Sequence, residues 1–431
     1  MQTNFTAAQL ADPHVAESEK ILRTCVHCGF CTATCPTYVT LGNELDSPRG
    51  RIYLIKDMLE TGRAADEETV THIDRCLSCL SCMTTCPSGV HYMHLVDHAR
   101  AHIEKTYKRP LADRAMRALL AAVLPYPARF RAALKLARLG RPFAPLMKGV
   151  RALKPLGAML DLAPASLRAS PPPAAQTVRP AFNRGRVAIL AGCAQSVLDP
   201  GINAAAKRLL NRLGVEVVEA KGEVCCGALV HHMGREDEAL VFARANIDAW
   251  MKLIEAGGLD AILITTSGCG TTVKDYGFML RLDPAYAEKA KRVAALAKDL
   301  TEFLATLDLP PPVQASGLTV AYHSACSMQH GQNIAREPKE LLAKAGFAVR
   351  EPREGHLCCG SAGIYNILQS DIADSLRERK VRNIEATGAD IVAAGNLGCM
   401  SQIGHGMEKP IVHTVELLDW AWGGPKPPAL P

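Results

Sequence analysis

The second half of the chain alternates short apolar runs with longer amphipathic stretches. The apolar runs have the character of strands, and each ends on or beside a cysteine: RVAILAGCA at 186–194, AILITTSGCG at 261–270, TVAYHSACS at 319–327 and DIVAAGNLGCM at 390–400. Between them lie helical patterns such as NAAAKRLLNRLG and KELLAKAGFAV, followed by the strand-like segments VEVVEA and AVREP. Strands that alternate with helices of about ten residues predict parallel α/β units.

The cysteines of this half form an internal repeat. Cys193, Cys225, Cys226 and Cys269 recur as Cys326, Cys358, Cys359 and Cys399, at offsets of 133, 133, 133 and 130 residues. Three identical offsets indicate a duplicated unit. We therefore predict two α/β cysteine-rich domains, at 185–312 and 313–431, each with a Cys-Cys-Gly motif at its centre.

The stretch before this repeat is basic and contains no cysteine. Lys108 to Arg168 holds thirteen Lys and Arg and two acidic residues, a local charge of +11. Its apolar spacing predicts short amphipathic helices interrupted by prolines, and the proline-rich stretch 169–184 predicts a linker. We assign 108–184 to this basic connector. Its charge suits either a solvated helical face or a docking surface for an acidic partner subunit or anionic lipid headgroups.

Composition narrows the class of protein. With 48% hydrophobic residues over 431 positions, the chain has ample material for packed cores, so disorder is excluded for most of it. Sixteen cysteines in so long a chain indicate thiol chemistry rather than a disulfide scaffold. The opening MQTNFTAAQLADPH lacks the features of a secretory signal, and we expect a reducing cytosolic compartment. No apolar run is suited to a membrane span, so we expect a soluble or peripheral protein and no nucleic-acid partner.

The first eight cysteines carry the most specific signal. They form two runs with the spacing Cys-x2-Cys-x2-Cys-x3-Cys-Pro, one at 25–36 and one at 76–87. In paired runs of this kind the fourth cysteine of each run binds the other cluster. We therefore predict a helical, dicluster ferredoxin-like domain over 1–107 with two [4Fe–4S] clusters. The predicted ligands are Cys25, Cys28, Cys31 and Cys86 for the first cluster, and Cys76, Cys79, Cys82 and Cys35 for the second.

Zinc is the alternative for such motifs, but a four-sulfur zinc site does not require four cysteines twice over. His27 lies within the first run, where all eight sulfurs are already assigned, and we expect it outside the ligand set. Between the runs, Ser47 before Pro48 predicts a helix N-cap. Arg49 and Arg51 in that helix either face cluster sulfides or a partner carboxylate, or are solvated.

The twin Cys-Cys-Gly motifs predict further sites. Adjacent cysteines make poor disulfides, whereas loops at strand ends bring each pair together with the flanking cysteines into a four-thiol pocket. Gly227 and Gly360 permit close approach of the backbone to a cofactor. We predict a metal or cluster in at least one copy, against the alternative of buried free cysteines. We assign no role to the nearby tyrosines and histidines: Tyr276, Tyr322, Tyr365, His231, His232, His323, His330, His356, His405 and His413.

The sequence lacks other catalytic signatures. It contains no Gly-x-Gly-x-x-Gly after a strand, no Walker loop and no Ser-His-Asp pattern. We therefore assign no catalytic residue and no flavin or nicotinamide site. Such a chain passes electrons but depends on a partner to oxidise an organic substrate.

These features together resemble the iron–sulfur subunits of bacterial glycolate oxidase, a membrane-associated glycolate dehydrogenase. The resemblance is carried by CVHCGFCTATCPTY, DSPRGRIYLIK, RCLSCLSCMTTCPSGV, both Cys-Cys-Gly motifs and the order of the domains. It implies flavoprotein subunits that hold FAD and oxidise glycolate to glyoxylate. It also implies that this chain carries electrons from FAD through both clusters toward quinone, at the cytoplasmic face of the inner membrane.

The resemblance leaves alternatives. Similar subunits serve glycerol-3-phosphate and lactate oxidation, and a non-redox metal-binding scaffold is a further interpretation of the cysteines. Related domains of heterodisulfide reductase end in Cys-x2-Cys, but here Cys269-Gly-Thr-Thr and Cys399-Met-Ser-Gln lack that last cysteine. A four-cysteine cluster, zinc or an empty reduced pocket remain open for these sites.

Overall fold

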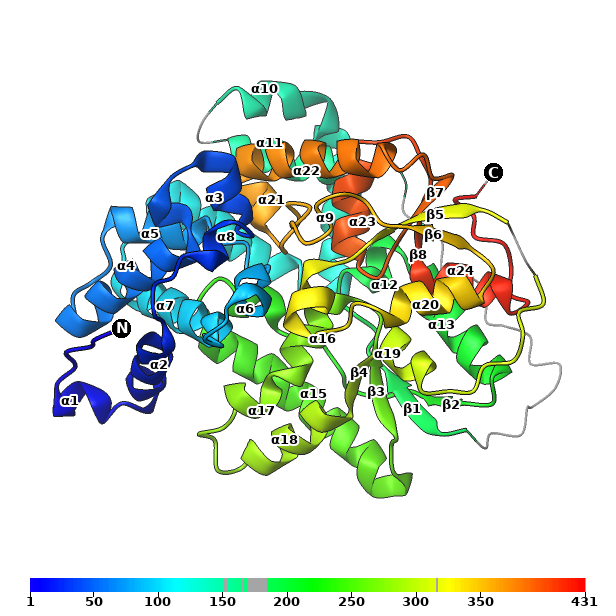
Figure 1. Cartoon of the computed structure of the whole chain (residues 1–431), viewed down its shortest axis with the longest axis horizontal. Coiled ribbons are helices and arrows are strands. Elements are labelled where there is room, and N and C mark those ends of the chain that lie inside the picture. The colour runs from blue at the N-terminus through cyan, green and yellow to red at the C-terminus, as the bar shows by residue number, and fades with distance from the viewer. Residues whose placement is uncertain (151–152, 165, 167, 169–183, 315–316, 431) are drawn as a thin grey trace.

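A computed structural model describes residues 1–150, 153–164, 166, 168, 184–314 and 317–430 (Figure 1). The linker predicted at 169–184 lies outside these residues except for Arg184. The N-terminal part is helical and ends in the long helix α7, and a second group of helices follows before the first strand. Two sheets form the rest, coloured green and yellow to red in Figure 1.

The N-terminal helices surround an apolar core that includes Ile55, Ile73 and Leu95. Helix α4 begins as predicted: Ser47 is its N-cap, its Oγ accepts a hydrogen bond from the Gly50 N–H at 3.0 Å, and Pro48 is the first helical residue. The elements are α1 (Ala7–Leu10), α2 (Pro13–Thr24), η1 (Phe30–Thr32), α3 (Pro36–Leu41), η2 (Glu44–Asp46), α4 (Pro48–Thr61), α5 (Glu67–Asp74), α6 (Ser81–Thr85) and α7 (Tyr92–Thr106).

The basic connector is helical, and prolines delimit its helices. Pro127 opens α9, and Pro142 and Pro145 lie in the short turns that follow it, because proline lacks an N–H and suits the first turn of a helix. The elements are α8 (Leu111–Val123), α9 (Pro127–Gly140), η3 (Arg141–Phe143), α10 (Ala144–Lys148) and α11 (Lys154–Leu162).

Each cysteine repeat contains one four-stranded parallel sheet, with strand orders β2-β1-β3-β4 and β6-β5-β7-β8. The central strands β3 and β7 are buried along their whole length, as expected for strands covered on both faces. In the first repeat the elements are β1 (Arg186–Ile189), α12 (Gln195–Leu198), α13 (Gly201–Arg212), β2 (Glu216–Val218), α14 (Ala228–His231), α15 (Glu236–Gly257), β3 (Ala261–Ile264), α16 (Ser267–Lys274), α17 (Tyr276–Met279), α18 (Ala287–Leu296), β4 (Ala297–Asp299) and α19 (Leu300–Ala305). In the second they are β5 (Thr319–His323), η4 (Ser327–Gly331), α20 (Glu337–Lys344), β6 (Ala348–Arg350), α21 (Tyr365–Leu368), α22 (Ser370–Glu385), β7 (Ile391–Ala394), α23 (Leu397–Gly404), β8 (Ile411–His413) and α24 (Thr414–Ala421).

The two sheets share one apolar core. Val187 of β1 and Val320 of β5 belong to the same buried cluster, and α13 packs against α24. Buried Asp419 on α24 accepts a hydrogen bond from Arg212 of α13 at 2.9 Å. The predicted fold class, a helical dicluster domain followed by repeated α/β units, is confirmed. The domain limits stay a prediction, since the repeats pack as one body.

Buried His413 joins the repeats and makes their contact sensitive to pH. Its Nε2 donates to the Thr265 carbonyl at 2.8 Å, and its Nδ1 accepts from the Val415 N–H at 3.2 Å, so the neutral ring satisfies both partners. Burial lowers the pKa of His413 to about 4. A histidine whose pKa is lower in the folded state stabilises the fold fully above its unfolded pKa of about 6.5, and this contribution is lost as the pH falls toward 4.

We expect protonation of His413 to lower the free energy of unfolding by about 2 kcal/mol when the pH falls from 7 to 5. Urea denaturation of the wild type and of His413→Gln at both pH values measures this term, because glutamine keeps a donor for Thr265 but does not titrate. An equal pH difference in the two proteins would contradict the assignment.

Candidate iron–sulfur and metal centres

The two N-terminal cysteine runs lie in loops that follow helices and wrap around two adjacent cavities. In both runs the residues two and four positions after the first cysteine have a left-handed backbone: His27 and Gly29 in one, Ser78 and Leu80 in the other. Left-handed residues in such turns form concave arrays of backbone N–H groups that bind anions, including iron–sulfur clusters. Non-glycine residues adopt this conformation at a cost of about 1 kcal/mol or more, and such strain concentrates at functional sites.

Each cavity is lined by cysteines from both runs. The first cavity is lined by Cys25, Cys28, Cys31, Cys86 and also Cys82, and the second by Cys35, Cys76, Cys79 and Cys82. Each cavity thus contains one of the two groups predicted from spacing, and Cys82 borders both. Which sulfur binds which cluster stays a prediction. Tyr92 borders both cavities, which places them side by side.

The donor set fits a cluster of soft metal ions. Burial, reinforced by the nearby thiol of Cys25, raises the pKa of Cys31 to about 11. Burial also raises the pKa values of Cys79 and Cys82 well above the usual value. Four thiolates therefore cannot persist in such a cavity without compensating positive charge. Iron in a [4Fe–4S] cluster supplies that charge and prefers thiolate sulfur.

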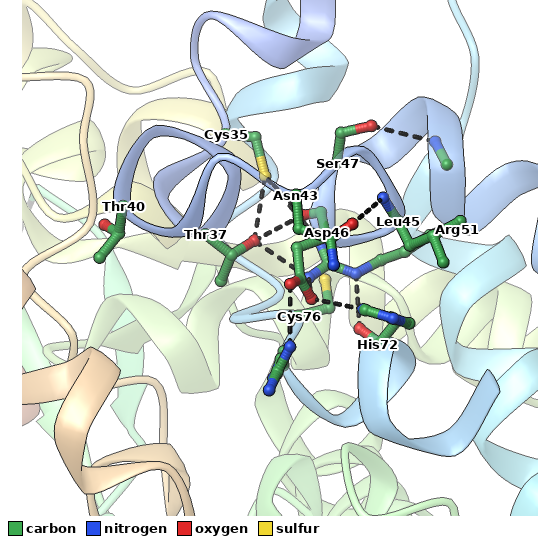
Figure 2. A network of polar contacts seen from close by, with 12 residues as sticks. Cys35, Thr37, Thr40, Asn43, Leu45, Asp46, Ser47, Arg51, His72 and Cys76 are labelled. Atoms are coloured by element: carbon green, nitrogen blue, oxygen red, sulfur yellow. Dashed lines mark hydrogen bonds and ion pairs between the residues drawn. The ribbon is translucent and has the colours of Figure 1, made fainter. Parts of the chain in front are cut away.

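A buried guanidinium lies beside the second cavity. The Arg51 side chain is 1% exposed, and it extends from α4 toward Cys35, where its Nη1 is 3.8 Å from the sulfur (Figure 2). Its Nε donates to the His72 carbonyl at 2.7 Å, and its Nη2 donates to Thr37 at 3.0 Å. Of the two arginines considered from the sequence, Arg51 faces the sulfurs, whereas Arg49 pairs with Glu44 at the surface and borders the first cavity.

Asp46 balances this charge beneath the cysteine loop. It is fully buried, 3.6 Å from Arg51, and its carboxylate accepts hydrogen bonds from His72 at 2.8 Å and Arg75 at 3.0 Å. Its carbonyl oxygen accepts a hydrogen bond from Thr37 at 2.7 Å (Figure 2). The network thereby fixes Arg51 in place, because a buried charge is tolerated only when it is paired and hydrogen-bonded.

Two further groups hold the Cys76 loop, and sequence reasoning identified neither. The Tyr92 hydroxyl donates to the Cys76 sulfur at 3.9 Å. Arg100 on α7 donates to the Cys76 carbonyl at 2.7 Å and to the Ser78 hydroxyl at 2.5 Å. Both residues lie on α7, outside the motif, so no local spacing distinguishes them from ordinary core residues.

The structure brings together the four cysteines of the first repeat. Buried Cys225 and Cys226 belong to one cluster, and Cys193 and Cys269 pack against that cluster. The backbone of the cysteine pair is held from behind, because Asn246 donates to the Cys225 carbonyl at 2.9 Å and the Tyr276 hydroxyl donates to the Cys226 carbonyl at 2.8 Å. Tyr276, left without a role by sequence reasoning, positions this loop.

The second repeat gathers its four cysteines in the same way. The Cys326 and Cys358 sulfurs are 3.7 Å apart, and the hydrogen bond between Cys359 and Cys399 lowers the pKa of the Cys399 thiol. A Cβ at Gly360 would lie 2.5 Å from the Ala373 carbonyl oxygen, so only glycine permits this turn.

A histidine makes the second site different from the first. Buried His323 offers a ring nitrogen within 4.8 Å of the Cys359 and Cys399 sulfurs. Sequence reasoning assigned it no role. The available signal was its position at the end of β5, three residues before Cys326, where the first repeat has Leu190.

The second repeat also adjoins the second N-terminal cavity. Cys79 and Cys358 belong to the same buried cluster of side chains. Nearby, the Tyr365 hydroxyl donates to the Arg75 carbonyl at 3.0 Å, and Thr84 and His330 are hydrogen-bonded at 2.7 Å. The cysteines of the first repeat belong to a different cluster. The cysteine site of the second repeat therefore packs with the ferredoxin-like part, whereas the cysteine site of the first repeat does not share that cluster.

Comparison with known proteins agrees with this arrangement. Residues 21–90 match the family model described as "4Fe-4S dicluster domain", and residues 187–274 and 320–404 match "Cysteine-rich domain". A structure of a hypothetical protein from Helicobacter pylori, 11% identical, aligns over 96% of this chain and 73% of its own with a TM-score of 0.54, which supports the fold alone. Among the described residues, no helix combines the length and apolar character that crossing a bilayer requires.

Curated relatives cover nearly the whole chain. The glycolate oxidase iron-sulfur subunit of Escherichia coli K12 is 42% identical over 98% of this chain and 99% of its own length. The probable glycolate oxidase iron-sulfur subunit of Bacillus subtilis 168 is 31% identical over 92% and 93%. Lactate utilization protein A of Bacillus subtilis 168 is 27% identical over only 54% of this chain. The chain belongs to the family of glycolate oxidase iron–sulfur subunits.

Proposed function

We propose that this chain is the electron-transfer subunit of a glycolate dehydrogenase complex. FAD on partner flavoprotein subunits oxidises glycolate to glyoxylate, and the electrons pass through this chain toward quinone. The observation that carries the proposal is the pair of adjacent cavities, each lined by at least four cysteines drawn from both N-terminal motifs.

In this proposal, Cys25, Cys28, Cys31 and Cys86 bind one [4Fe–4S] cluster, and Cys76, Cys79, Cys82 and Cys35 bind the other. Such clusters supply one-electron transfer. The chain buries all four cysteines of the second site, whereas in the first site Cys25 is buried and Cys28 is exposed. Arg51 contributes a fixed positive charge beside Cys35, which favours the reduced state of the second site.

The cysteine-rich repeats are proposed as further metal or cluster sites with different roles. Because Cys358 and Cys79 share one buried cluster of side chains, we infer that the second repeat exchanges electrons with the second cluster. The first repeat binds its metal at a site that does not share a buried cluster with the second N-terminal site. The complex is proposed to lie at the cytoplasmic face of the inner membrane, where quinone is accessible.

The function is tested with the anaerobically purified chain and its flavoprotein subunits. We expect glycolate to reduce the clusters, seen as two interacting [4Fe–4S] signals by EPR, only when the flavoprotein subunits are present. Glycerol 3-phosphate and lactate are the control substrates, and faster reduction by either would transfer the assignment to that pathway. Zinc without iron, or full dye reduction by a complex containing Cys31→Ser, would support a structural scaffold instead.

A matched pair of variants tests the unequal repeats. We expect Cys326→Ala and Cys193→Ala each to lower the metal content of its own site, since the two cysteines hold equivalent positions. Only Cys326→Ala is expected to alter the EPR line shape of the second N-terminal cluster. Metal analysis and EPR measure both effects, and equal changes in the two variants would contradict the proposed contact.

A further inference from the structure

Four large apolar side chains protrude from the part of the basic connector that runs from α9 to α10. Leu136, Leu139, Phe143 and Leu146 are 70%, 76%, 57% and 75% exposed, although leucine and phenylalanine are usually buried. These four residues follow one another along α9, η3 and α10. Figure 1 shows α10 at an outer edge of the molecule.

Their spacing places them on one side of the chain. The intervals of three, four and three residues are those of neighbours on a helix surface. The backbone keeps right-handed helical angles at Gly140, Arg141, Phe143 and Ala144, where α9 passes through η3 into α10. The series therefore continues across the junction.

The opposite side of the same segment packs against the rest of the protein. Phe130, Leu134 and Ala137 of α9 and Ala144 of α10 are buried in one cluster with Leu160 of α11. The segment is thus anchored by one apolar face and presents a second one to the outside. Folding of the described chain does not account for that second face.

Basic side chains surround the exposed face. Lys135, Arg138 and Arg141 are exposed and lie next to the protruding residues. None of the three forms an ion pair within the part of the chain that the structure describes. The sequence contains no acidic residue between Asp113 and Asp161, so no carboxylate of this segment offsets the charge.

We propose that this face, Leu136 to Leu146, is the surface by which the chain binds an anionic lipid membrane. The leucines and Phe143 enter the boundary between headgroups and acyl chains, and Lys135, Arg138 and Arg141 contact anionic headgroups. This inference rests on the peripheral attachment in the proposed function and locates it in the chain.

Charge complementarity favours a lipid surface over a protein partner. A helix that combines exposed Leu and Phe with Lys and Arg, and lacks acidic residues, matches the composition of helices that lie in the membrane interface. The negative potential of an anionic leaflet attracts such basic segments. The protruding chains need no complementary pocket in a fluid bilayer, whereas a protein partner would have to supply one for each.

The test uses the full chain with its clusters and co-sedimentation with vesicles. We expect binding to phosphatidylcholine vesicles that contain phosphatidylglycerol, weaker binding to phosphatidylcholine alone, and a decrease with added salt. Leu139→Ser combined with Phe143→Ser is expected to weaken binding by about tenfold or more. Exchanging Lys135, Arg138 and Arg141 for glutamine is expected to abolish the preference for the anionic lipid.

The matched control is Val241→Ser combined with Leu282→Ser, two exposed apolar residues elsewhere on the surface. We expect this control to bind vesicles like the wild type. Equal losses in both double variants, or no binding of the wild type to anionic vesicles, would overturn the proposal. Loss of flavoprotein binding or of self-association in Leu139→Ser with Phe143→Ser, without loss of vesicle binding, would instead assign the face to a protein contact.

Glycolate-dependent cluster reduction separates this inference from the proposed function. We expect the Leu139→Ser, Phe143→Ser variant to keep that reduction in solution while it loses vesicle binding. The wild type could bind anionic vesicles as expected while glycolate and the flavoprotein subunits fail to reduce its clusters. That result would contradict the proposed function and still support the membrane-binding surface.

Discussion

Cys35→Ala is expected to remove the second cluster and to leave the first, although Cys35 belongs to the first motif. Cys35 lines the cavity of Cys76, Cys79 and Cys82, so its loss leaves that site with three ligands. Alanine, unlike serine, supplies no replacement ligand atom. We expect about four fewer iron atoms per chain and loss of the magnetic interaction between clusters, measured by iron and sulfide analysis and by EPR.

Double variants show which cluster each fourth cysteine serves. If Cys35 and Cys76 bind the same cluster, combining their alanine variants costs no more iron than either alone. If Cys35 and Cys25 bind different clusters, combining those variants removes both. The mirror test pairs Cys86 with Cys25. The reverse outcome, additive loss for Cys35 with Cys76, would show that each motif binds its own cluster.

Arg51→Gln is expected to have the second largest effect, on both stability and redox potential. The substitution takes one of two guanidinium groups away from buried Asp46, which keeps Arg75 and His72 as partners, and it removes the hydrogen bonds to Thr37 and the His72 carbonyl. We expect this to lower the free energy of unfolding by about 2 kcal/mol. The lost positive charge also disfavours the reduced cluster. At an effective dielectric constant of about 20, a unit charge several ångströms away changes the one-electron potential by on the order of 100 mV.

Redox titration monitored by EPR and chemical denaturation measure these two effects. We expect the potential of the second cluster to fall in Arg51→Gln and to recover in part in Arg51→Lys, which restores the charge. Arg63→Gln is the control for stability, because its ion pairs with Asp57 and Asp66 are at the surface and contribute little. An unchanged potential in Arg51→Gln would exclude this electrostatic role.

Local patterns in the sequence already contained the candidate ligands and the fold class. Cysteine spacing identified the two N-terminal runs, because three cysteines three residues apart on one loop are the local signature of ligands to one cluster. The repeated apolar runs predicted the parallel strands, which depend on local periodicity and burial. The Ser47 N-cap was predictable for the same reason, since it involves only neighbouring residues.

The groups that act on those cysteines from elsewhere were decided by tertiary structure. Arg51 and Arg49 belong to the same helix turn, and only the packing of α4 against the Cys35 loop buries one and leaves the other at the surface. His323 gained its place beside Cys359 and Cys399 through the pairing of β5 with β7.

Cys79 and Cys358 lie 279 positions apart in the sequence, and they share one buried cluster only because the second repeat docks on the ferredoxin-like part. The sequence by itself therefore determined which ligand types the chain has and in what order, because spacing is a local property. Only the tertiary structure decided which charges and neighbouring sites each set of cysteines faces, because those contacts arise between segments whose separation leaves no periodic signal.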